Sequence, residues 1–362
     1  MNSKWMCASA LMLVAACGSE KGSGSAGAAG TTPAASAASG ADLTGAGATF
    51  PYPIYSKWFS EYATATGVKI NYQSIGSGGG IRQLTEKTVD FGASDAPMGD
   101  DELAKVSAPV MHFPTVLGAV CITYNLPDVA APLKLSGPVI AGIYQGTIKK
   151  WNAPEIRALN AGVKLPDTDI LVVHRSDGSG TTYIFSDYLA AVSPDWAKAP
   201  GKGKELQWPV GIGGKGNEGV AGQIKQTPGA IGYVELAYAK QNSLPVASVK
   251  NADGQSVAPT VESVTAAAAG VAQHLAPNSD YRVSIVNAPG ATAYPISSFT
   301  YLLVYTTEPD ATKGKKLVDF LRWMYTTGEP EAPALDYAPL PPSLITRLTA
   351  RLDSIQVGPA HS

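Results

Sequence analysis

Three glycine-rich segments carry hydroxyl or charged side chains, and a stretch of helical period follows each one. They lie at residues 45–51, 76–80 and 175–181. The free N–H groups and positive dipole at the start of a helix favour an anion, which glycine lets the backbone approach closely. Hydroxyl groups and the Arg175 guanidinium can donate to the oxygens of a tetrahedral anion. Together they predict an oxyanion site. Each segment alone is typical of ordinary helix capping, and Arg175 beside Asp177 alone is typical of a surface ion pair.

Alternating helices and strands are expected to position these segments. Apolar residues recur at helical spacing over 53–66, 80–88, 181–192 and 315–325, and strand-like runs lie at 68–72, 90–94, 116–124, 170–174, 230–234 and 301–305. Strands interleaved with helices predict an α/β fold. The runs 116–124 and 287–295 are the candidate crossovers between two lobes. Lobe I is expected to comprise 42–118 and 288–362, and lobe II 119–287.

Composition narrows the classes of function. The 362 residues are 45% hydrophobic and only 15% charged, with a net charge of -2. No run of Lys or Arg offers an electrostatic footprint for nucleic acid. The four histidines do not stand near other metal-type ligands at metal-like spacing, and no P-loop occurs. We therefore expect no metal, no cofactor and no catalytic residue.

The first 17 residues have the layout of a secretory signal, since Lys4 precedes a short apolar stretch that ends in small residues before Cys17. Residues 13–17 resemble a bacterial lipobox, in which the cysteine is acylated; a plain signal peptide with a chance cysteine is the alternative. Residues 18–41 are almost entirely Gly, Ser, Ala, Thr and Pro, a composition that predicts a flexible tether. We expect an extracytoplasmic, periplasmic protein held to a membrane by lipid on Cys17.

Seven motifs, in order from about Leu43 to the C-terminus, resemble those of the high-affinity phosphate-binding protein of bacterial phosphate ABC transporters. They lie at 45–51, 75–80, 89–97, 142–152, 175–181, 213–217 and 228–235. The resemblance implies the two-lobed, type II periplasmic binding protein fold with ligand in the interlobe cleft. It implies phosphate contacts from Thr49, Phe50 through its backbone, Ser77, Asp95, Arg175, Ser179, Gly180 and Thr181.

The same resemblance implies that Asp177 holds the Arg175 guanidinium in place. It also implies a monomer that delivers inorganic phosphate to the membrane permease subunits of the transporter. Two positions depart from the family pattern: Gly78 stands where relatives often have serine, and His174 where many have arginine. Neither is a matched ligand position, so they bear on affinity and local charge rather than on the identity of the ligand.

Asp95 is the unexpected member of this set, because a carboxylate should repel an anion. It fits a ligand that still carries a proton, which the carboxylate can accept. Sulfate has no such proton at neutral pH, so its oxygen would face the carboxylate with no hydrogen between them. An unpaired buried charge costs several kcal/mol, and every 1.4 kcal/mol lowers affinity about tenfold. Asp95 therefore predicts discrimination against sulfate. The alternative role is that of an ordinary turn or capping residue after a strand.

Other functions remain as alternatives. A receptor for sulfate, molybdate or arsenate would use similar donors, and arsenate is protonated like phosphate. A phosphatase with a phosphorylated serine is disfavoured because Gly178-Ser179-Gly180 does not form the Gly-x-Ser-x-Gly pattern of a nucleophile elbow. A surface adhesin or scaffold would leave the Thr, Ser, Asp and Arg set without a purpose.

Overall fold

The computed structural model describes residues 42–130, 132–272 and 280–358, so the signal segment, Cys17 and the tether lie outside the described residues. The elements up to the long central strand are β1 (Leu43–Gly47), α1 (Tyr52–Thr66), β2 (Ile70–Ser74), α2 (Ser77–Thr85), β3 (Phe91–Ser94), α3 (Asp100–Leu103) and β4 (Val110–Tyr124). They are followed by β5 (Lys134–Leu135), α4 (Gly137–Tyr144), α5 (Pro154–Leu159), β6 (Leu171–Arg175), α6 (Gly180–Val192), α7 (Pro194–Lys198), β7 (Ile212–Gly214), α8 (Gly216–Gln226), β8 (Ala230–Glu235) and α9 (Leu236–Gln241).

The last part of the chain contains β9 (Ser248–Lys250), β10 (Ser256–Val257), α10 (Val261–Ala272), β11 (Ser297–Tyr305), β12 (Thr307–Glu308), α11 (Ala311–Trp323), α12 (Pro342–Arg351) and β13 (Gln356–Val357). A π-helical turn (Met324–Gly328) and a 3₁₀ segment (Glu329–Leu335) join α11 to the stretch before α12. No helix among the described residues is both long enough and apolar enough to cross a bilayer. Strands interleaved with helices confirm the predicted α/β class.

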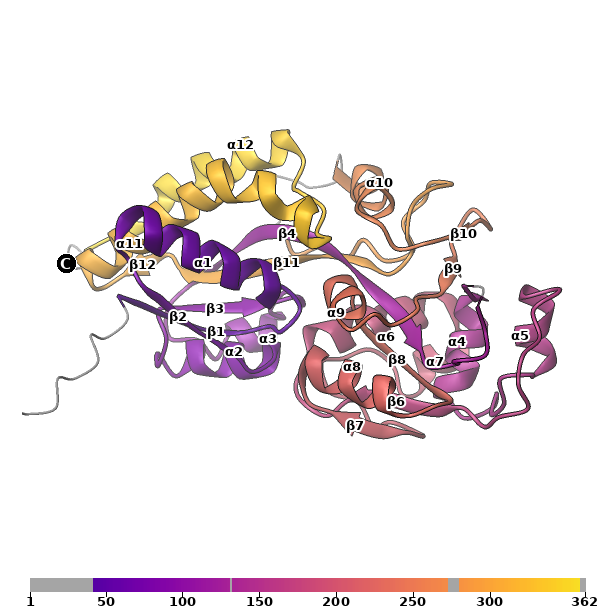
Figure 1. Cartoon of the computed structure of the whole chain (residues 1–362). Coiled ribbons are helices and arrows are strands. Elements are labelled where there is room, and N and C mark those ends of the chain that lie inside the picture. The colour runs from indigo at the N-terminus through magenta and orange to yellow at the C-terminus, as the bar shows by residue number, and fades with distance from the viewer. Residues whose placement is uncertain (1–41, 131, 273–279, 359–362) are drawn as a thin grey trace, which may run out of the picture. The chain divides into compact units, whose positions relative to one another are not determined.

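One eight-stranded sheet, in the order β2-β1-β3-β11-β4-β8-β6-β7, organises the fold. Strand β4 belongs to both halves of this sheet: residues 110–119 pair with β11 and residues 120–124 with β8, antiparallel in each case. We call β1–β3, β11 and the start of β4, with α1, α2 and α11, the first lobe. The end of β4 and β6–β8, with α4 to α9, form the second lobe (Figure 1).

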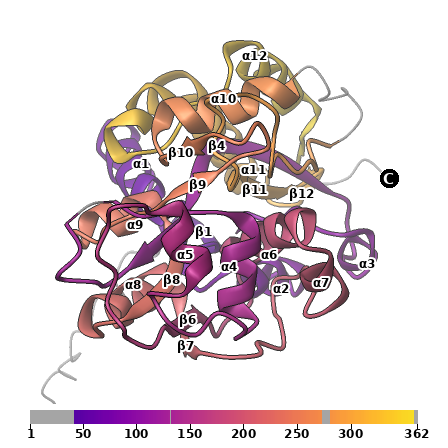
Figure 2. The ribbon, with the colours of Figure 1, turned by 90° about the vertical axis from the view of Figure 1, so that its right-hand side faces the viewer.

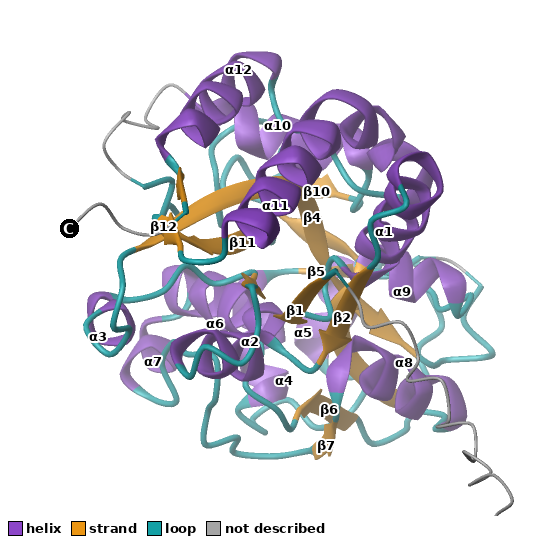
Figure 3. Cartoon of the chain, turned by 90° about the vertical axis from the view of Figure 1, so that its left-hand side faces the viewer, coloured by secondary structure: helices purple, strands orange, loops and turns teal. Residues whose placement is uncertain are grey.

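Helices cover the sheet strands of both lobes. In the first lobe α1 and α11 lie on one face of β1–β3, and α2 lies on the other (Figure 3). In the second lobe α6 and α8 both contact β8, and α4, α6 and α8 gather around β6 and β8 (Figure 2). Helix α10 packs on β4 and β11, where those two strands pair.

The central strand is longer than its apolar run predicts. It begins at Val110 rather than at 116, because pairing with β11 continues past Pro114. Thr300 pairs with Val116 and Tyr301 with Pro114, so Thr115 is an extra residue in β4. Such a bulge accommodates a proline inside a sheet, which is why Pro114 does not end the strand.

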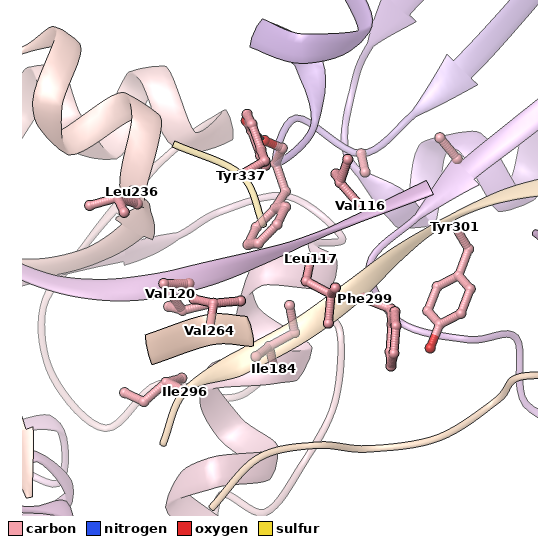
Figure 4. Packing of buried hydrophobic residues seen from close by; sticks show 14 of the residues in the cluster. Val116, Leu117, Val120, Ile184, Leu236, Val264, Ile296, Phe299, Tyr301 and Tyr337 are labelled. Carbon is pink, nitrogen blue, oxygen red and sulfur yellow. Dashed lines mark hydrogen bonds between the residues drawn. The ribbon is translucent and has the colours of Figure 1, made fainter. Parts of the chain in front are cut away.

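Every residue of β4 is buried, and its side chains contribute to a core that contains residues of both lobes. Figure 4 shows Leu117 of β4 near Ile184 of α6 and Phe299 of β11, with Val116 on the opposite side of the strand. Burial of apolar surface on both faces of one strand ties the lobes together along it. Helix α6 contacts this strand, and a Cβ at Gly118 of β4 would lie 2.5 Å from the Phe50 ring, so the segments that enter α1 and α6 are held next to it.

Candidate functional site

The start of α2, the start of α6 and the end of β3 meet at one side chain. The hydroxyl oxygen of Ser77 accepts hydrogen bonds from the backbone N–H of Gly180 at 3.0 Å and of Asp95 at 3.3 Å. A Cβ at Gly180 would lie 2.5 Å from both Ser77 Oγ and Asp95 Oδ2, so only glycine fits there. Helix α2 begins at Ser77 rather than at the predicted residue 80, which places this hydroxyl in its first turn.

Arg175, the last residue of β6, is almost fully buried and is held by a carboxylate. Its Nε donates to Asp177 Oδ1 at 2.7 Å and its Nη2 to Asp177 Oδ2 at 2.5 Å, a bidentate arrangement that fixes the plane of the guanidinium. Burial alone would raise the pKa of Asp177, but the hydrogen bonds and charge of Arg175 outweigh it and hold that pKa below its ordinary value. The remaining nitrogen, Nη1, donates to Thr181 Oγ1 at 3.2 Å.

Asp95 follows β3 and is only 1% exposed. Its Oδ1 accepts a hydrogen bond from the Thr300 hydroxyl at 2.8 Å, and its Oδ2 lies 3.5 Å from Ser77 Oγ. Burial raises the pKa of Asp95 to about 7, against the lowering effects of the Thr300 hydrogen bond and the Arg175 charge. The carboxyl group therefore exchanges a proton close to neutral pH.

Thr49 and Thr181 come from opposite lobes and meet at a residue to which the sequence assigned no role. The side-chain amide of Asn217, in the first turn of α8, donates to Thr49 Oγ1 at 2.7 Å and to Thr181 Oγ1 at 3.2 Å. All three side chains are at most 1% exposed. Asn217 ends the glycine-rich segment 213–217, and its position at the start of a further helix is the signal that could have identified it.

Thr300 is the second residue that sequence reasoning missed. It lies inside β11, where no local pattern distinguishes it. It reaches Asp95 because β11 pairs antiparallel with β3, with Tyr301 opposite Ser94. Only long-range strand pairing could reveal this contact.

The two remaining predicted residues have contacts of a different kind. Ser179 caps α6: its hydroxyl oxygen accepts from the Thr182 N–H at 3.0 Å, and its own N–H donates to the Lys204 carbonyl at 2.9 Å. The Phe50 carbonyl accepts from the Tyr337 hydroxyl at 2.6 Å, and the Phe50 ring is fully buried. Both lie on segments that lead into α1 or α6, so their backbone groups border the cluster.

Lys204 also links the lobes next to this cluster. Its ammonium group lies 2.6 Å from Glu102 Oε2 of the first lobe, while its carbonyl holds the Ser179 N–H. The side chains of Lys204 and Glu102 are 18% and 27% exposed. Lys204, Arg175 and Asp177 also line a pocket of about 660 Å³ beside β6. An ion pair across the lobes is thus joined directly to the start of α6.

Taken together, the cluster offers one fixed guanidinium, several hydroxyls, the N–H groups of helix starts and one readily protonated carboxyl. Such a set can surround a small tetrahedral oxyanion with donors and accept one proton from it. Two α/β lobes that share a central strand and enclose this kind of site define a solute-binding protein. Consistent with that class, the family model for the PBP superfamily domain matches residues 32–327.

The chain belongs to the family of phosphate-binding proteins PstS. It is 46% identical over 321 residues to the phosphate-binding protein PstS of Xylella fastidiosa, and the matched stretch covers 88% of this chain and 87% of that relative. It is 48% identical over 312 residues to the protein of the same name from Pasteurella multocida, covering 85% and 89% of the two chains.

Solved structures share the fold. A high-affinity periplasmic phosphate-binding protein, solved with phosphate, superposes with a TM-score of 0.70 at 23% identity, over 88% of this chain and 96% of that one. A phosphate-binding protein from Stenotrophomonas maltophilia gives a TM-score of 0.68 at 21% identity, over 85% and 93%. The predicted two-lobed, type II periplasmic binding protein fold is thereby confirmed.

Proposed function

We propose that the protein binds inorganic phosphate in the cluster between its lobes and delivers it to an ABC-type phosphate importer. The ligands are Thr49, the Phe50 backbone, Ser77, Asp95, Arg175, Ser179, Gly180 and Thr181, with Asp177 fixing the Arg175 guanidinium. The observation that carries the proposal is a buried carboxyl, Asp95, placed among donors in a protein whose relatives are named for phosphate.

Asp95 explains selectivity for a protonated anion. A phosphate that retains a proton donates it to the carboxylate, and the donors around it serve the remaining oxygens. Sulfate would bring an unprotonated oxygen against Asp95, leaving two buried negative groups without a hydrogen between them. Burial raises the pKa of Asp95 to about 7, so the charged carboxylate that repels sulfate predominates only above that pH. Arsenate carries a similar proton, so this mechanism does not discriminate against it.

Calorimetric titration of residues 42–362 with phosphate and with sulfate tests the proposal. The unmodified protein should bind phosphate from pH 5 to 8. It should ignore sulfate at pH 8, where Asp95 is charged, and exclude sulfate less strongly at pH 5, where the carboxyl holds a proton. Asp95→Asn should keep considerable phosphate binding and gain measurable sulfate binding, because the amide can donate as well as accept. Asp253→Asn, at an exposed turn, is the matched control. An unchanged phosphate-to-sulfate ratio in Asp95→Asn would show that Asp95 has no part in selectivity.

Arg175 should be needed for affinity rather than for folding. Arg175→Ala should lose at least about 2 kcal/mol of phosphate binding, the scale of a charge-assisted pair. Arg157→Ala, which removes an exposed arginine of α5, should bind like the unmodified protein. Unchanged phosphate affinity in Arg175→Ala would remove that residue from the site.

The family is one of solute-binding proteins, and we infer that this member does not hydrolyse phosphate esters. An assay for phosphate release, run beside the binding titration, separates receptor from phosphatase. We further infer that the protein acts as a monomer with the permease subunits as its partners. The lobes divide at 42–118 with 288–362 and at 119–287, an assignment that the two pairing segments of β4 support.

We place the protein outside the cytoplasm, anchored by an acyl chain on Cys17 and followed by the tether 18–41. The lipobox-like residues 13–17 support this placement. Cys17→Ser should give a protein that no longer partitions with lipids or needs detergent for extraction. A variant as membrane-bound as its parent would contradict lipidation at this position.

A further inference from the structure

Asn217 occupies a position that the fold ties to the guanidinium site. Strands β6 and β7 pair in parallel with Arg175 next to Gly214, which brings the turn after β7 beside Arg175. Gly216, at a φ of +71°, donates its N–H to Asp177 Oδ1 at 3.0 Å. The carboxylate that fixes the guanidinium therefore also fixes the turn from which Asn217 projects.

The orientation of the Asn217 amide is set by its partners. Its Oδ1 accepts a hydrogen bond from the Glu235 N–H at 2.9 Å, and a backbone N–H can only donate. The Nδ2 group must then face the other way, toward Thr49 Oγ1 and Thr181 Oγ1. Both hydrogens of the amide are thus given to threonine hydroxyls, one from each lobe.

The two hydroxyls have no acceptor capacity left. A hydroxyl oxygen can accept about two hydrogen bonds and donate one. Thr49 Oγ1 accepts from both Nδ2 and the backbone N of Asn217, the latter at 3.2 Å. Thr181 Oγ1 accepts from Asn217 Nδ2 and from Arg175 Nη1, each at 3.2 Å. Each O–H hydrogen is left to be donated, and no group within 42–130, 132–272 or 280–358 accepts either one.

We infer that Asn217 is a positioning residue that forces Thr49 and Thr181 to donate into the site. The inference rests on the proposed phosphate site and adds how the bound phosphate is oriented in it. Unprotonated oxygens of the anion face Thr49 and Thr181, and the protonated oxygen faces Asp95. Because the two threonines come from opposite lobes, one amide sets the direction in which a hydroxyl of each lobe donates.

The test is a double-mutant comparison in the full chain, with phosphate as the ligand. Asn217→Asp keeps the shape and the acceptor for Glu235 N–H, but it offers the hydroxyls an oxygen to which they can turn. It should weaken phosphate binding about 100-fold at pH 8, because the two hydroxyls no longer donate to the phosphate and the new carboxylate repels it. Asn217→Ser is uncharged and too short to reach both hydroxyls, and should weaken binding about tenfold.

The same two changes are then made in Thr49→Val/Thr181→Val, which lacks both hydroxyls. In that background Asn217→Ser should have almost no further effect on phosphate affinity. Asn217→Asp should weaken binding only through repulsion between the new carboxylate and the phosphate. Asn71→Asp and Asn71→Ser, at an exposed position of β2, are the matched controls and should bind normally. Relative to the unmodified protein, the affinity of Asn217→Asp should recover as pH falls, because its protonated carboxyl becomes a donor again.

Each outcome is decisive. If Asn217 changes weaken binding by the same factor with and without the threonine hydroxyls, or if Asn217→Asp shows no recovery at low pH, Asn217 does not orient them. If Asn217→Asp does not fold, as judged by thermal unfolding, Asn217→Ser supplies the same comparison. If the unmodified protein does not bind phosphate, the proposed function fails before Asn217 is tested.

Discussion

Replacing Asp95 by asparagine should change how the stability of the phosphate-free protein depends on pH. Asp95 is 1% exposed, and burial raises its pKa from 3.8 to about 7. Between those values the folded protein holds a proton that the unfolded chain has released. The free energy of unfolding therefore falls as pH rises, by about 1.4 kcal/mol per unit, and the loss is complete above the folded pKa.

Asparagine has no proton to lose, so the variant escapes this loss. At pH 5 Asp95 is neutral in the folded protein, and comparison with Asp95→Asn there reports only shape and hydrogen bonding. Two units separate pH 5 from the folded pKa of about 7, so the variant should gain about 2 to 3 kcal/mol relative to the parent between pH 5 and pH 8. Glu308 and Glu329, whose pKa values burial raises to about 7 and about 8, respond equally in both proteins and cancel.

The assay is urea unfolding of both proteins without phosphate at pH 5, 6, 7 and 8 and constant ionic strength. The difference between the two unfolding free energies should grow with pH and level off above about pH 7. A difference that is the same at all four pH values would refute the reasoning, since Asp95 would then ionise as it does in the unfolded chain.

Three further changes test the surroundings of the site. Thr300→Val removes the 2.8 Å hydrogen bond that lowers the pKa of Asp95, so NMR titration of the Asp95 carboxyl carbon should show a higher pKa, and an unchanged titration would contradict the contact. Lys204→Gln breaks the ion pair with Glu102 and should speed phosphate release about threefold to tenfold in stopped-flow measurements, and the release rate should depend less on salt concentration. Lys198 is 80% exposed, and Lys198→Gln should leave the release rate unchanged. Burial raises the pKa of Glu329 to about 8, so Glu329→Gln should gain up to about 4 kcal/mol of stability relative to the parent as pH rises from 5 to 8. Calorimetry should give the same phosphate affinity for both proteins, and a loss of affinity would mean that Glu329 acts on the site.

Local patterns were sufficient for the parts of the fold that depend on neighbours in sequence. The alternation of apolar residues predicted α1, α6, β6 and β8 close to their observed bounds. The start of α11 was harder to place, because its first turn is hydrophilic and its beginning is set by Asp310, which accepts from the N–H groups of Thr312 and Lys313. The extent of β4 depends on its pairing with β11, which lies far along the chain.

The sequence by itself determined which chemical groups are available: a guanidinium with its carboxylate two residues away, hydroxyls at glycine-rich helix starts, and a carboxylate after a buried strand. These features are local, because capping and turn chemistry act over a few residues. Tertiary structure alone decided how these groups act. It buried Asp95 and so raised its pKa, placed Thr300 against it through strand pairing, and brought Thr49 and Thr181 to one amide of Asn217. Desolvation and hydrogen-bond partners arise from residues far apart in the chain, such as Thr300 and Asp95, which are 205 positions apart, and no local pattern encodes them.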